Sequence, residues 1–197
     1  MVKKIQHPLN RRSVVKAILK DRGEKLLVTG LGSPSYDAHA AGDNVKNFYL
    51  WGAMGGAAMV GLGLAISQKD KKIMVITGDG EQLMGLGGMA TIGVQNPKNL
   101  ILIVLDNMHY GETGMQKSHT FYGIDLCKIA LASGFKHSFE ILNNNQLNEI
   151  IRFIETNDGP IFVNIKVSDF KTSRSLPIVD GIYCKNRFRR AIGFSPL

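Results

Sequence analysis

Cysteine is scarce in this sequence, and its two cysteines, Cys127 and Cys184, lie far apart. They have neither the spacing of a zinc site nor that of a disulfide framework, which excludes the small folds that depend on either. Because unpaired cysteines are typical of reducing compartments, we expect a cytoplasmic protein. No secretory signal is visible at the start of the chain.

Charge is scarce in the middle of the chain. The formal net charge is +8, but the basic residues gather in "KKIQHPLNRR" near the start and in "KNRFRR" within a basic C-terminal tail of about residues 170–197. No basic patch interleaved with aromatic residues is present, so we do not expect nucleic-acid binding. Two interpretations of the basic ends stay open: a solvated surface, or contact with an anionic substrate or a partner chain.

Residues 48–68 carry no charge at all, which raises the question of a membrane span. Glycines at 52, 55, 56, 61 and 63, and the lack of a second such stretch, favour a closely packed buried helix instead. We therefore expect no membrane insertion. Packing inside the domain and packing near an interface with another chain remain equally open for this segment.

The rest of the chain alternates between strand-like and helix-like patterns, and its 197 residues suit a single domain, residues 1–197. Helices are expected over 11–20, with Asn10 as the cap, over 81–95, over 126–132 and over 146–156. Apolar, strand-like runs include "KLLVTG", "KKIMVIT", "NLILIVL", "FKHSFEI" and "PIFVNIKV". Continuous apolar strands separated by helices predict an α/β fold in three layers, a parallel sheet with helices on both faces.

Two polar motifs follow neighbouring core strands of this expected sheet. "GDG", residues 78–80, comes after one apolar strand, and "DN", residues 106–107, after the next. Ligands of parallel sheets bind at the carboxyl ends of strands, and the amides at the start of a helix favour an anion. Asp79 would repel an anion unless a divalent cation lay between them, and Mg²⁺ is commonly shared between a carboxylate and phosphate groups. Asn107 can offer its side-chain carbonyl to the same ion, and a backbone carbonyl two residues later a third oxygen.

Other phosphate-binding loops are absent, since the chain has neither G-x-x-x-x-G-K-[ST] nor G-x-G-x-x-G. "GDGEQLMGLGGMATIGVQNPKNLILIVLDN" resembles the thiamine-diphosphate motif, in which Gly-Asp-Gly is followed further along by Asn-Asn. With "NFYLWGAMGGAAMVGLGLA" before it and "LDNMHYGETGMQ" after it, residues 11–168 resemble the diphosphate-binding domain of thiamine-diphosphate-dependent 2-oxo acid decarboxylases, above all those acting on sulfopyruvate or phosphonopyruvate.

This resemblance implies thiamine diphosphate and Mg²⁺ as cofactors, and it implies roles for particular residues. The metal ligands would be the side chains of Asp79 and Asn107 and the backbone oxygen of His109. The residues near the cofactor would be Gly52, whose carbonyl accepts from its amino group, Ala53, Met54, which wedges beneath it, Gly78, Gly80 and Glu81, whose amides meet the diphosphate, Tyr110 and Gly111. Glu112 and His109 are the candidates for handling protons. Asp106 departs from the usual first Asn of the motif, although the second position is the ligand.

The resemblance also implies a missing part. Family members activate the cofactor with a glutamate from a separate pyrimidine-binding domain, for which this chain has no room. We therefore expect a pyrimidine-binding α subunit, an active site at the interface, and a hetero-oligomer such as α₂β₂ or larger. The substrate would be a small 2-oxo acid. A carboligase of the acetolactate-synthase kind, an oxidative 2-oxo acid enzyme and a non-catalytic partner remain as alternatives.

Overall fold

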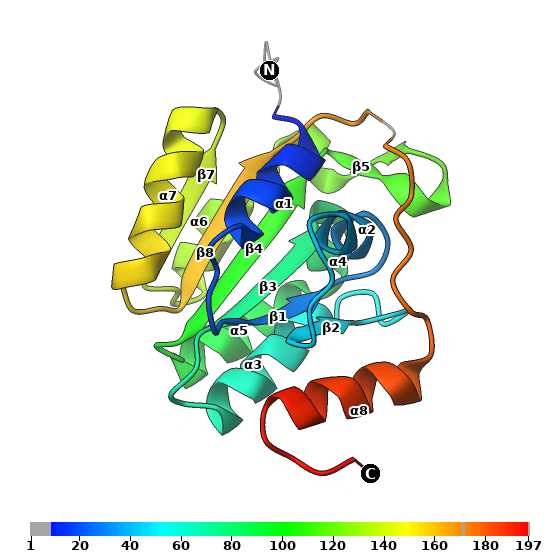
Figure 1. Cartoon of the computed structure of the whole chain (residues 1–197). Helices are drawn as coiled ribbons and strands as arrows, with labels where there is room; N and C mark the ends of the chain where they lie inside the picture. Colours follow the sequence, from blue (N-terminus) through cyan, green and yellow to red (C-terminus); the bar gives the residue numbers. More distant parts are fainter. Residues whose placement is uncertain (1–8, 171, 197) are drawn as a thin grey trace.

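The structure, a computed structural model, describes residues 9–170 and 172–196. Its centre is a six-stranded sheet in which every pair of neighbouring strands is parallel (Figure 1). In order across the sheet the strands are β2 (Asn47–Tyr49), β1 (Leu26–Thr29), β3 (Ile73–Gly78), β4 (Leu100–Asp106), β8 (Ile161–Lys166) and β7 (His137–Ile141). The predicted parallel sheet is confirmed.

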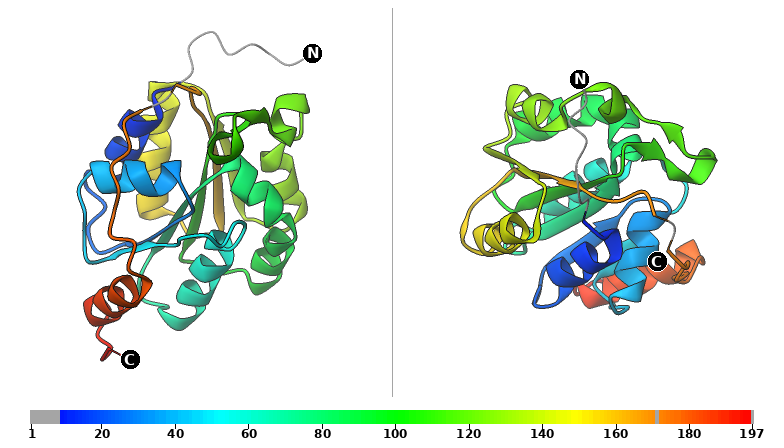
Figure 2. Two further views of the ribbon diagram at one scale, coloured as in Figure 1. Left: turned by 90° about the vertical axis from the view of Figure 1, so that its right-hand side faces the viewer. Right: turned by 90° about the horizontal axis from the view of Figure 1, so that it is seen from above.

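Helices cover both faces of this sheet, as Figure 2 shows. One face packs against α1 (Arg11–Leu19), α2 (Ser33–Ala40) and α7 (Asn144–Thr156). The other packs against α3 (Ala57–Ser67), α5 (Leu86–Gln95) and α6 (Leu126–Ala132), while α8 (Gly181–Ala191) lies beside β2. The three-layer α/β architecture expected from the sequence is therefore present.

Strand β4 separates the two hydrophobic cores. Because successive side chains of a strand point to opposite faces, Ile101 and Ile103 join the core under α1 and α7, whereas Leu102 and Val104 join the core under α3 and α5. All seven residues of β4 are buried. A strand buried on both faces reads as a continuous apolar run, which is why the sequence identifies it so clearly.

Some expected helices differ from the observed ones. Asn10 caps α1 as predicted, its side chain accepting from the amide of Ser13. The helix expected over 81–95 is instead two helices, α4 (Asp79–Met84) and α5, which meet at Gly85. Gly85 lies against the backbone of Gly55, where an added Cβ would be 2.3 Å from the carbonyl oxygen of Gly55. The close approach of two backbones explains the break.

The uncharged stretch over 48–68 is only partly helical. It comprises most of β2, a loop and α3, so the glycine-rich helix expected to end near Gln68 is present but occupies only the second half of the stretch. Gly61 lets α3 approach β3 closely, since an added Cβ would be 2.2 Å from a methyl group of Val75. Within the described residues no helix is long and apolar enough to cross a membrane.

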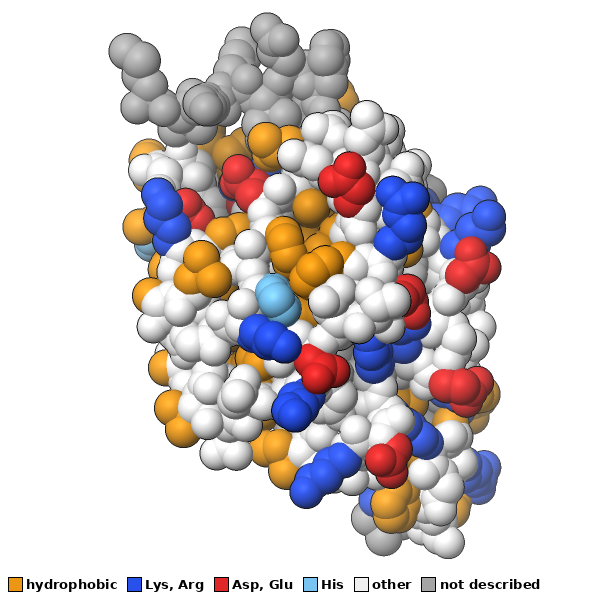
Figure 3. All heavy atoms as spheres, turned by 90° about the vertical axis from the view of Figure 1, so that its left-hand side faces the viewer, with side chains coloured by type: hydrophobic (Ala, Val, Ile, Leu, Met, Phe, Trp, Pro, Cys, Tyr) orange, Lys and Arg blue, Asp and Glu red, His pale blue; other side chains and the backbone are white. Residues whose placement is uncertain are grey.

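The basic C-terminal tail contains α8, which the sequence did not predict. Its Phe188 packs edge-on against Phe48 of β2, and its Arg187 is paired with Asp43 at 2.6 Å. On the face of the molecule drawn in Figure 3, basic and acidic side chains are interspersed, with no large continuous basic area. This distribution agrees with the solvated-surface interpretation of the charge.

The order of the strands creates a crevice between β1 and β3. The chain runs from β1 outward to β2 and then returns past β1 to β3, so its progress along the sheet reverses between these two strands. The loop after β1 therefore leads to α2 on one face, and the end of β3 leads to α4 on the other. Such a reversal point leaves room for a ligand beside the carboxyl ends of the strands.

Candidate functional site

A pocket lies at this reversal point, bounded by the ends of β1, β3 and β4. The predicted cofactor, metal and catalytic residues that line it are Met54, Gly78, Asp79, Gly80, Glu81, Asn107, His109, Tyr110, Gly111 and Glu112. Gly52 and Ala53 are exposed in the loop between β2 and α3 and lie outside the lining. The fold thus gathers all but these two residues around one cavity.

Asp79 is the first residue of α4 and is 1% exposed. Its Oδ2 accepts a hydrogen bond from the hydroxyl of Ser118 at 2.5 Å, and the hydroxyl of Thr120 lies 3.3 Å away. Burial, together with the nearby carboxylate of Asp106, raises the pKa of Asp79 to about 6. Both causes disfavour the charged form, so the negative charge of this carboxylate is not compensated by a nearby cation.

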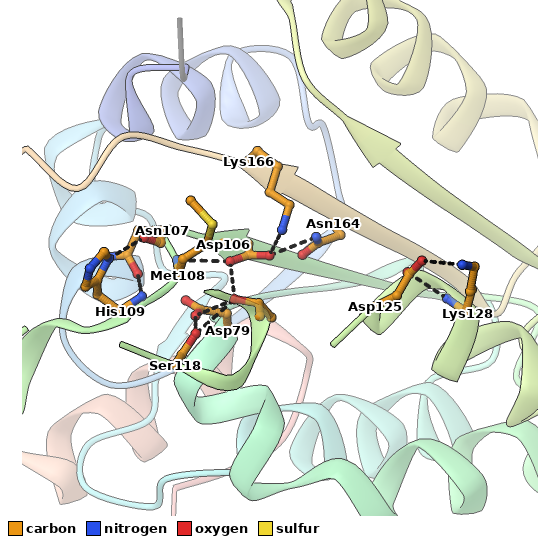
Figure 4. Close-up of polar contacts among 11 residues, drawn as sticks. Asp79, Asp106, Asn107, Met108, His109, Ser118, Asp125, Lys128, Asn164 and Lys166 are labelled. Carbon is orange, nitrogen blue, oxygen red and sulfur yellow. Dashed lines mark hydrogen bonds and ion pairs between the residues drawn. The ribbon is translucent and has the colours of Figure 1, made fainter. Parts of the chain in front are cut away.

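Asp106, at the end of β4, is completely buried but fully partnered. Its Oδ1 accepts from the amide of Met108 at 3.0 Å and from the hydroxyl of Thr120 at 2.8 Å. Its Oδ2 accepts from the Asn164 amide at 3.0 Å and is ion-paired with the Lys166 ammonium (Figure 4). The carboxylate of Asp106 therefore has a structural role, since residues of β8 hold it in place.

Of the carboxylates of Asp79 and Asp106, only that of Asp106 has an ammonium partner among the described residues. Among the described residues Asp79 has hydroxyl partners but no basic one. A buried carboxylate without a counter-ion is unfavourable unless a cation binds it. An oxygen-binding divalent cation such as Mg²⁺ would supply the missing charge, so the residues present fit the metal that the motif predicts.

Asn107 and His109 form a tight turn immediately after β4. The side-chain oxygen of Asn107 accepts from the amide of His109 at 2.9 Å, and Met108 between them has a left-handed φ of 63°. A carbonyl oxygen has two lone pairs, so Asn107 Oδ1 retains one for a cation. Within the described residues there is no group of three or more His, Cys, Asp or Glu suited to a metal. The metal ligands predicted from the motif are one carboxylate, one side-chain amide and one backbone carbonyl, which do not form a group of that type.

The imidazole of His109 is oriented by the same turn. Its Nδ1 lies 2.8 Å from the backbone oxygen of Asn107. Because a carbonyl oxygen can only accept, Nδ1 carries the hydrogen, and Nε2 holds the lone pair of the neutral ring. The fold thus leaves Nε2 as the nitrogen available to take up a proton.

Gly80 and Glu81 follow Asp79 in the first turn of α4. An added Cβ at Gly80 would lie 2.5 Å from the ring of Tyr110, so the glycine lets this ring pack on the helix. The buried side chain of Glu81 reaches the loop after β1 and accepts from the Leu31 amide at 3.1 Å. Its Oε1 has no hydrogen-bond partner among the described residues, and burial raises the pKa of Glu81. Glu81 therefore links α4 to the loop after β1.

Glu112 lies at the rim of the pocket. Its carboxylate is 3.7 Å from the guanidinium of Arg174 and packs against Gly32, at the start of α2. Arg11 also lines the cavity and is ion-paired with the buried Asp37, which Arg12 contacts at 2.9 Å as well. Two guanidinium groups thus share the carboxylate of Asp37 beside the pocket.

Several site residues carry no signal in the sequence. Asn164 and Lys166 lie far from both motifs along the chain, Ser118 and Thr120 lie just beyond the second, and all four join the site only through the fold. Arg11 belongs to the basic stretch near the start of the chain, for which contact with an anionic substrate is one of two interpretations. Lys166 is the clearest case, because the pairing of β4 with β8 sets it directly opposite Asp106. By contrast, the tail residue Arg187 does not line this pocket, and it contacts Asp43 instead.

A parallel sheet covered by helices on both faces, with a buried carboxylate and the start of a helix at its reversal point, is typical of a domain that binds an anionic ligand at the carboxyl ends of its strands. The family described as thiamine pyrophosphate enzyme, C-terminal TPP binding domain, matches residues 32–165. This chain belongs to that family.

Relatives in the same family extend the comparison. The chain is 43% identical to the sulfopyruvate decarboxylase subunit beta of Methanocaldococcus jannaschii over 147 residues, covering 71% of this chain and 78% of that protein. It is 32% identical to the subunit of the same name in Methanococcus maripaludis, covering 93% and 98%. A thiamin diphosphate-dependent enzyme structure from Mycobacterium smegmatis superposes with a TM-score of 0.71 at 17% identity, over 83% of this chain and 32% of the other. The structural likeness shows the shared fold.

Proposed function

We propose that this chain is the β subunit of a two-chain, thiamine-diphosphate- and Mg²⁺-dependent decarboxylase acting on sulfopyruvate or phosphonopyruvate, with an aldehyde and CO₂ as products. The observation that carries the proposal is the similarity to sulfopyruvate decarboxylase β subunits over nearly the whole chain, joined to the uncompensated carboxylate of Asp79 at the predicted motif. The two free cysteines are consistent with a cytoplasmic location.

In this proposal Mg²⁺ is held by the side chains of Asp79 and Asn107 and by the backbone oxygen of His109. The amides of Gly80 and Glu81, in the first turn of α4, would hold the diphosphate. Met54, Gly78, Tyr110 and Gly111 would contact the rest of the cofactor from the pocket wall, and Gly52 and Ala53 from the adjacent loop. The burial of Asp79 and the open lone pair of Asn107 support this assignment.

When bound, thiamine diphosphate supplies a carbanion-stabilising ring that accepts the electron pair left by departing CO₂. The residues of this chain would orient the substrate and handle the proton that the product takes up. Glu112, at the rim beside Arg174, and Nε2 of His109 are the candidate proton carriers. The chain offers no further acid in the pocket lining besides Asp79 and Glu81, among the residues described.

A partner chain completes the proposed site. We propose that this partner is a pyrimidine-binding α subunit and that it contributes the glutamate that activates the cofactor. The reaction would then occur between the two chains, in an α₂β₂ or larger assembly. The naming of the relatives as β subunits supports the existence of such a partner.

A guanidinium group in the lining of the pocket supports an acidic substrate. Arg11 is the one cationic residue among the described residues that line it, and Arg11 and Arg12 together exceed the charge of Asp37. A guanidinium group suits a sulfonate or phosphonate, because its planar donors match the oxygens of these anions. We therefore assign recognition of the distal acid group to Arg11.

The test is CO₂ release from sulfopyruvate, phosphonopyruvate and pyruvate, with Mg²⁺ and thiamine diphosphate, by this chain with and without the pyrimidine-binding chain. Release that requires the partner and favours one of the two acidic substrates is the expected result. A hydroxy-keto acid in place of the aldehyde would indicate a carboligase. No turnover of any acid by a pair that binds the cofactor would overturn the proposal.

A further inference from the structure

The buried Asp106 stands where the thiamine-diphosphate motif ordinarily has a neutral asparagine, and its surroundings in this chain match that change. Lys166 lies directly opposite it on β8 in the register of the sheet, and their side chains form an ion pair. The Lys166 side chain is 12% exposed and that of Asp106 is not exposed at all. The extra negative charge and the ammonium that neutralises it are therefore both held inside the site.

We propose that Lys166 is a positioning residue for the metal-binding turn, and that it acts through Asp106. This inference rests on the proposed function, because the turn is assigned to Mg²⁺ only there. It adds that Asp106 and Lys166 work as one neutral unit, so that either residue without the other weakens cofactor binding while removal of both charges leaves it nearly intact.

The hydrogen bonds of Asp106 connect Lys166 to the proposed metal ligands. Lys166 and Asn164 fix Oδ2 of Asp106 from β8. With the carboxylate fixed, Oδ1 accepts from the amide of Met108, the left-handed residue between Asn107 and His109. The orientation of Asn107 Oδ1 and of the His109 backbone therefore depends on a carboxylate that β8 holds in place (Figure 4).

A second connection runs to Asp79. The hydroxyl of Thr120 lies 2.8 Å from Asp106 Oδ1 and 2.9 Å from the Ser118 hydroxyl, which donates to Asp79. Each hydroxyl has one hydrogen, so Ser118 serves Asp79 and Thr120 serves Asp106 in the shortest arrangement. If Asp106 lost its cation and its carboxylate moved, the Thr120 hydroxyl would move with it and disturb its contact with Ser118, the residue that donates to the carboxylate proposed as a metal ligand.

The experiment is a double-mutant cycle in the two-chain assembly with the variants Lys166→Met, Asp106→Asn and the combination of both. Mg²⁺ would be titrated at saturating thiamine diphosphate by calorimetry, and the thermal unfolding midpoint would be measured without cofactor. Lys166→Arg keeps the charge and serves as the conservative variant. Lys25→Met is the matched control, because the Lys25 side chain is 10% exposed and paired with Glu155 at 2.7 Å, at the start of β1 and away from the pocket.

We expect Lys166→Met and Asp106→Asn each to weaken the apparent Mg²⁺ affinity by about tenfold or more, the range for residues that orient metal ligands. The first leaves an unpaired carboxylate and the second an unpaired ammonium that repels the ion. Each should also lower the unfolding midpoint by about 10 °C, because one buried charge loses its partner. The combined variant should return to within about threefold of the unmodified affinity, and Lys166→Arg should stay close to it.

Lys25→Met should lower the midpoint without changing the Mg²⁺ affinity, which separates a positioning role from general stability. Equal losses of affinity in Asp106→Asn and in the combined variant would overturn the inference, since they would make Asp106 a direct metal ligand. Additive effects of the two changes would also overturn it. If the unmodified assembly bound no thiamine diphosphate, the proposed function itself would fail, and the unfolding cycle would then decide whether the two residues act as one unit.

Discussion

Replacing Asp79 with asparagine should stabilise the cofactor-free protein while abolishing its metal binding. Burial raises the pKa of Asp79 to about 6, from an ordinary value of 3.8, and the neighbouring Asp106 adds to the shift. A difference of about 2 pKa units corresponds to about 3 kcal/mol of unfavourable free energy in the charged form. An asparagine has nearly the same shape and can still accept from Ser118, so the variant should recover most of this amount.

The stabilisation expected from Asp79→Asn depends on pH. Because the folded-state pKa lies above the unfolded one, folding takes up a proton between about pH 4 and pH 6. The free energy of unfolding of the unmodified protein therefore falls as the pH rises through this window, and the full penalty is present above about pH 6. The advantage of Asp79→Asn should be largest at pH 7 and should vanish near pH 4.

Thermal unfolding of the cofactor-free assembly at pH 7 and at pH 4 tests this reasoning. A gain of about 3 kcal/mol corresponds to roughly 10 °C in the unfolding midpoint for a chain of this size. Asp70→Asn, which removes the same charge from an exposed turn, is the control and should leave the midpoint unchanged. A variant no more stable than the unmodified protein at pH 7, or equally stabilised at both pH values, would refute the reasoning. Added Mg²⁺ and thiamine diphosphate should raise the midpoint only when Asp79 is present.

Three further predictions concern other parts of the site and its surroundings. Gly80→Ala should destabilise the fold by about 1–3 kcal/mol, because its methyl group would overlap the Tyr110 ring; an unchanged midpoint in urea titration would contradict this packing. Arg11→Met should raise the KM for sulfopyruvate at least tenfold and leave that for pyruvate nearly unchanged; equal changes for both acids would remove Arg11 from substrate recognition. Arg187→Ala should lower the free energy of unfolding by about 1 kcal/mol, by breaking its partly exposed pair with Asp43, and should leave the decarboxylase KM unaltered; a raised KM would restore the tail to substrate binding.

The sheet and the location of the site could be predicted because their signals are local. Strand β4 is a continuous apolar run, and Asp79 and Asn107 stand at the ends of two such runs, so parallel pairing alone brings them to one edge. Helix α2 is not among the helices expected from the sequence, because its Pro34 is more typical of a loop, although proline is well tolerated in the first turn of a helix. Helix α8 was missed because it is rich in basic residues and only Cys184 and Phe188 mark its buried side.

The supporting contacts of the site could not be predicted, because they depend on the pairing register of strands distant in the sequence. Lys166 meets Asp106 only when β8 aligns with β4 as observed, since a shift by one residue would turn its side chain to the opposite face. Ser118 and Thr120 reach Asp79 through a short turn, η2 (His119–Tyr122), that follows a small hairpin of β5 (His109–Tyr110) and β6 (Gln116–Lys117). Neither contact leaves a periodic pattern in the sequence.

The way in which the pocket is assembled also bears on how the protein folds. Its polar contacts join residues 39 positions apart, as for Ser118 and Asp79, or 60 apart, as for Lys166 and Asp106. Contacts between such distant residues form late and slowly, because long loops must close before parallel strands can pair. A partly folded chain that still lacked β8 would not hold the turn after β4. Cofactor binding would thus require that the last strand has entered the sheet.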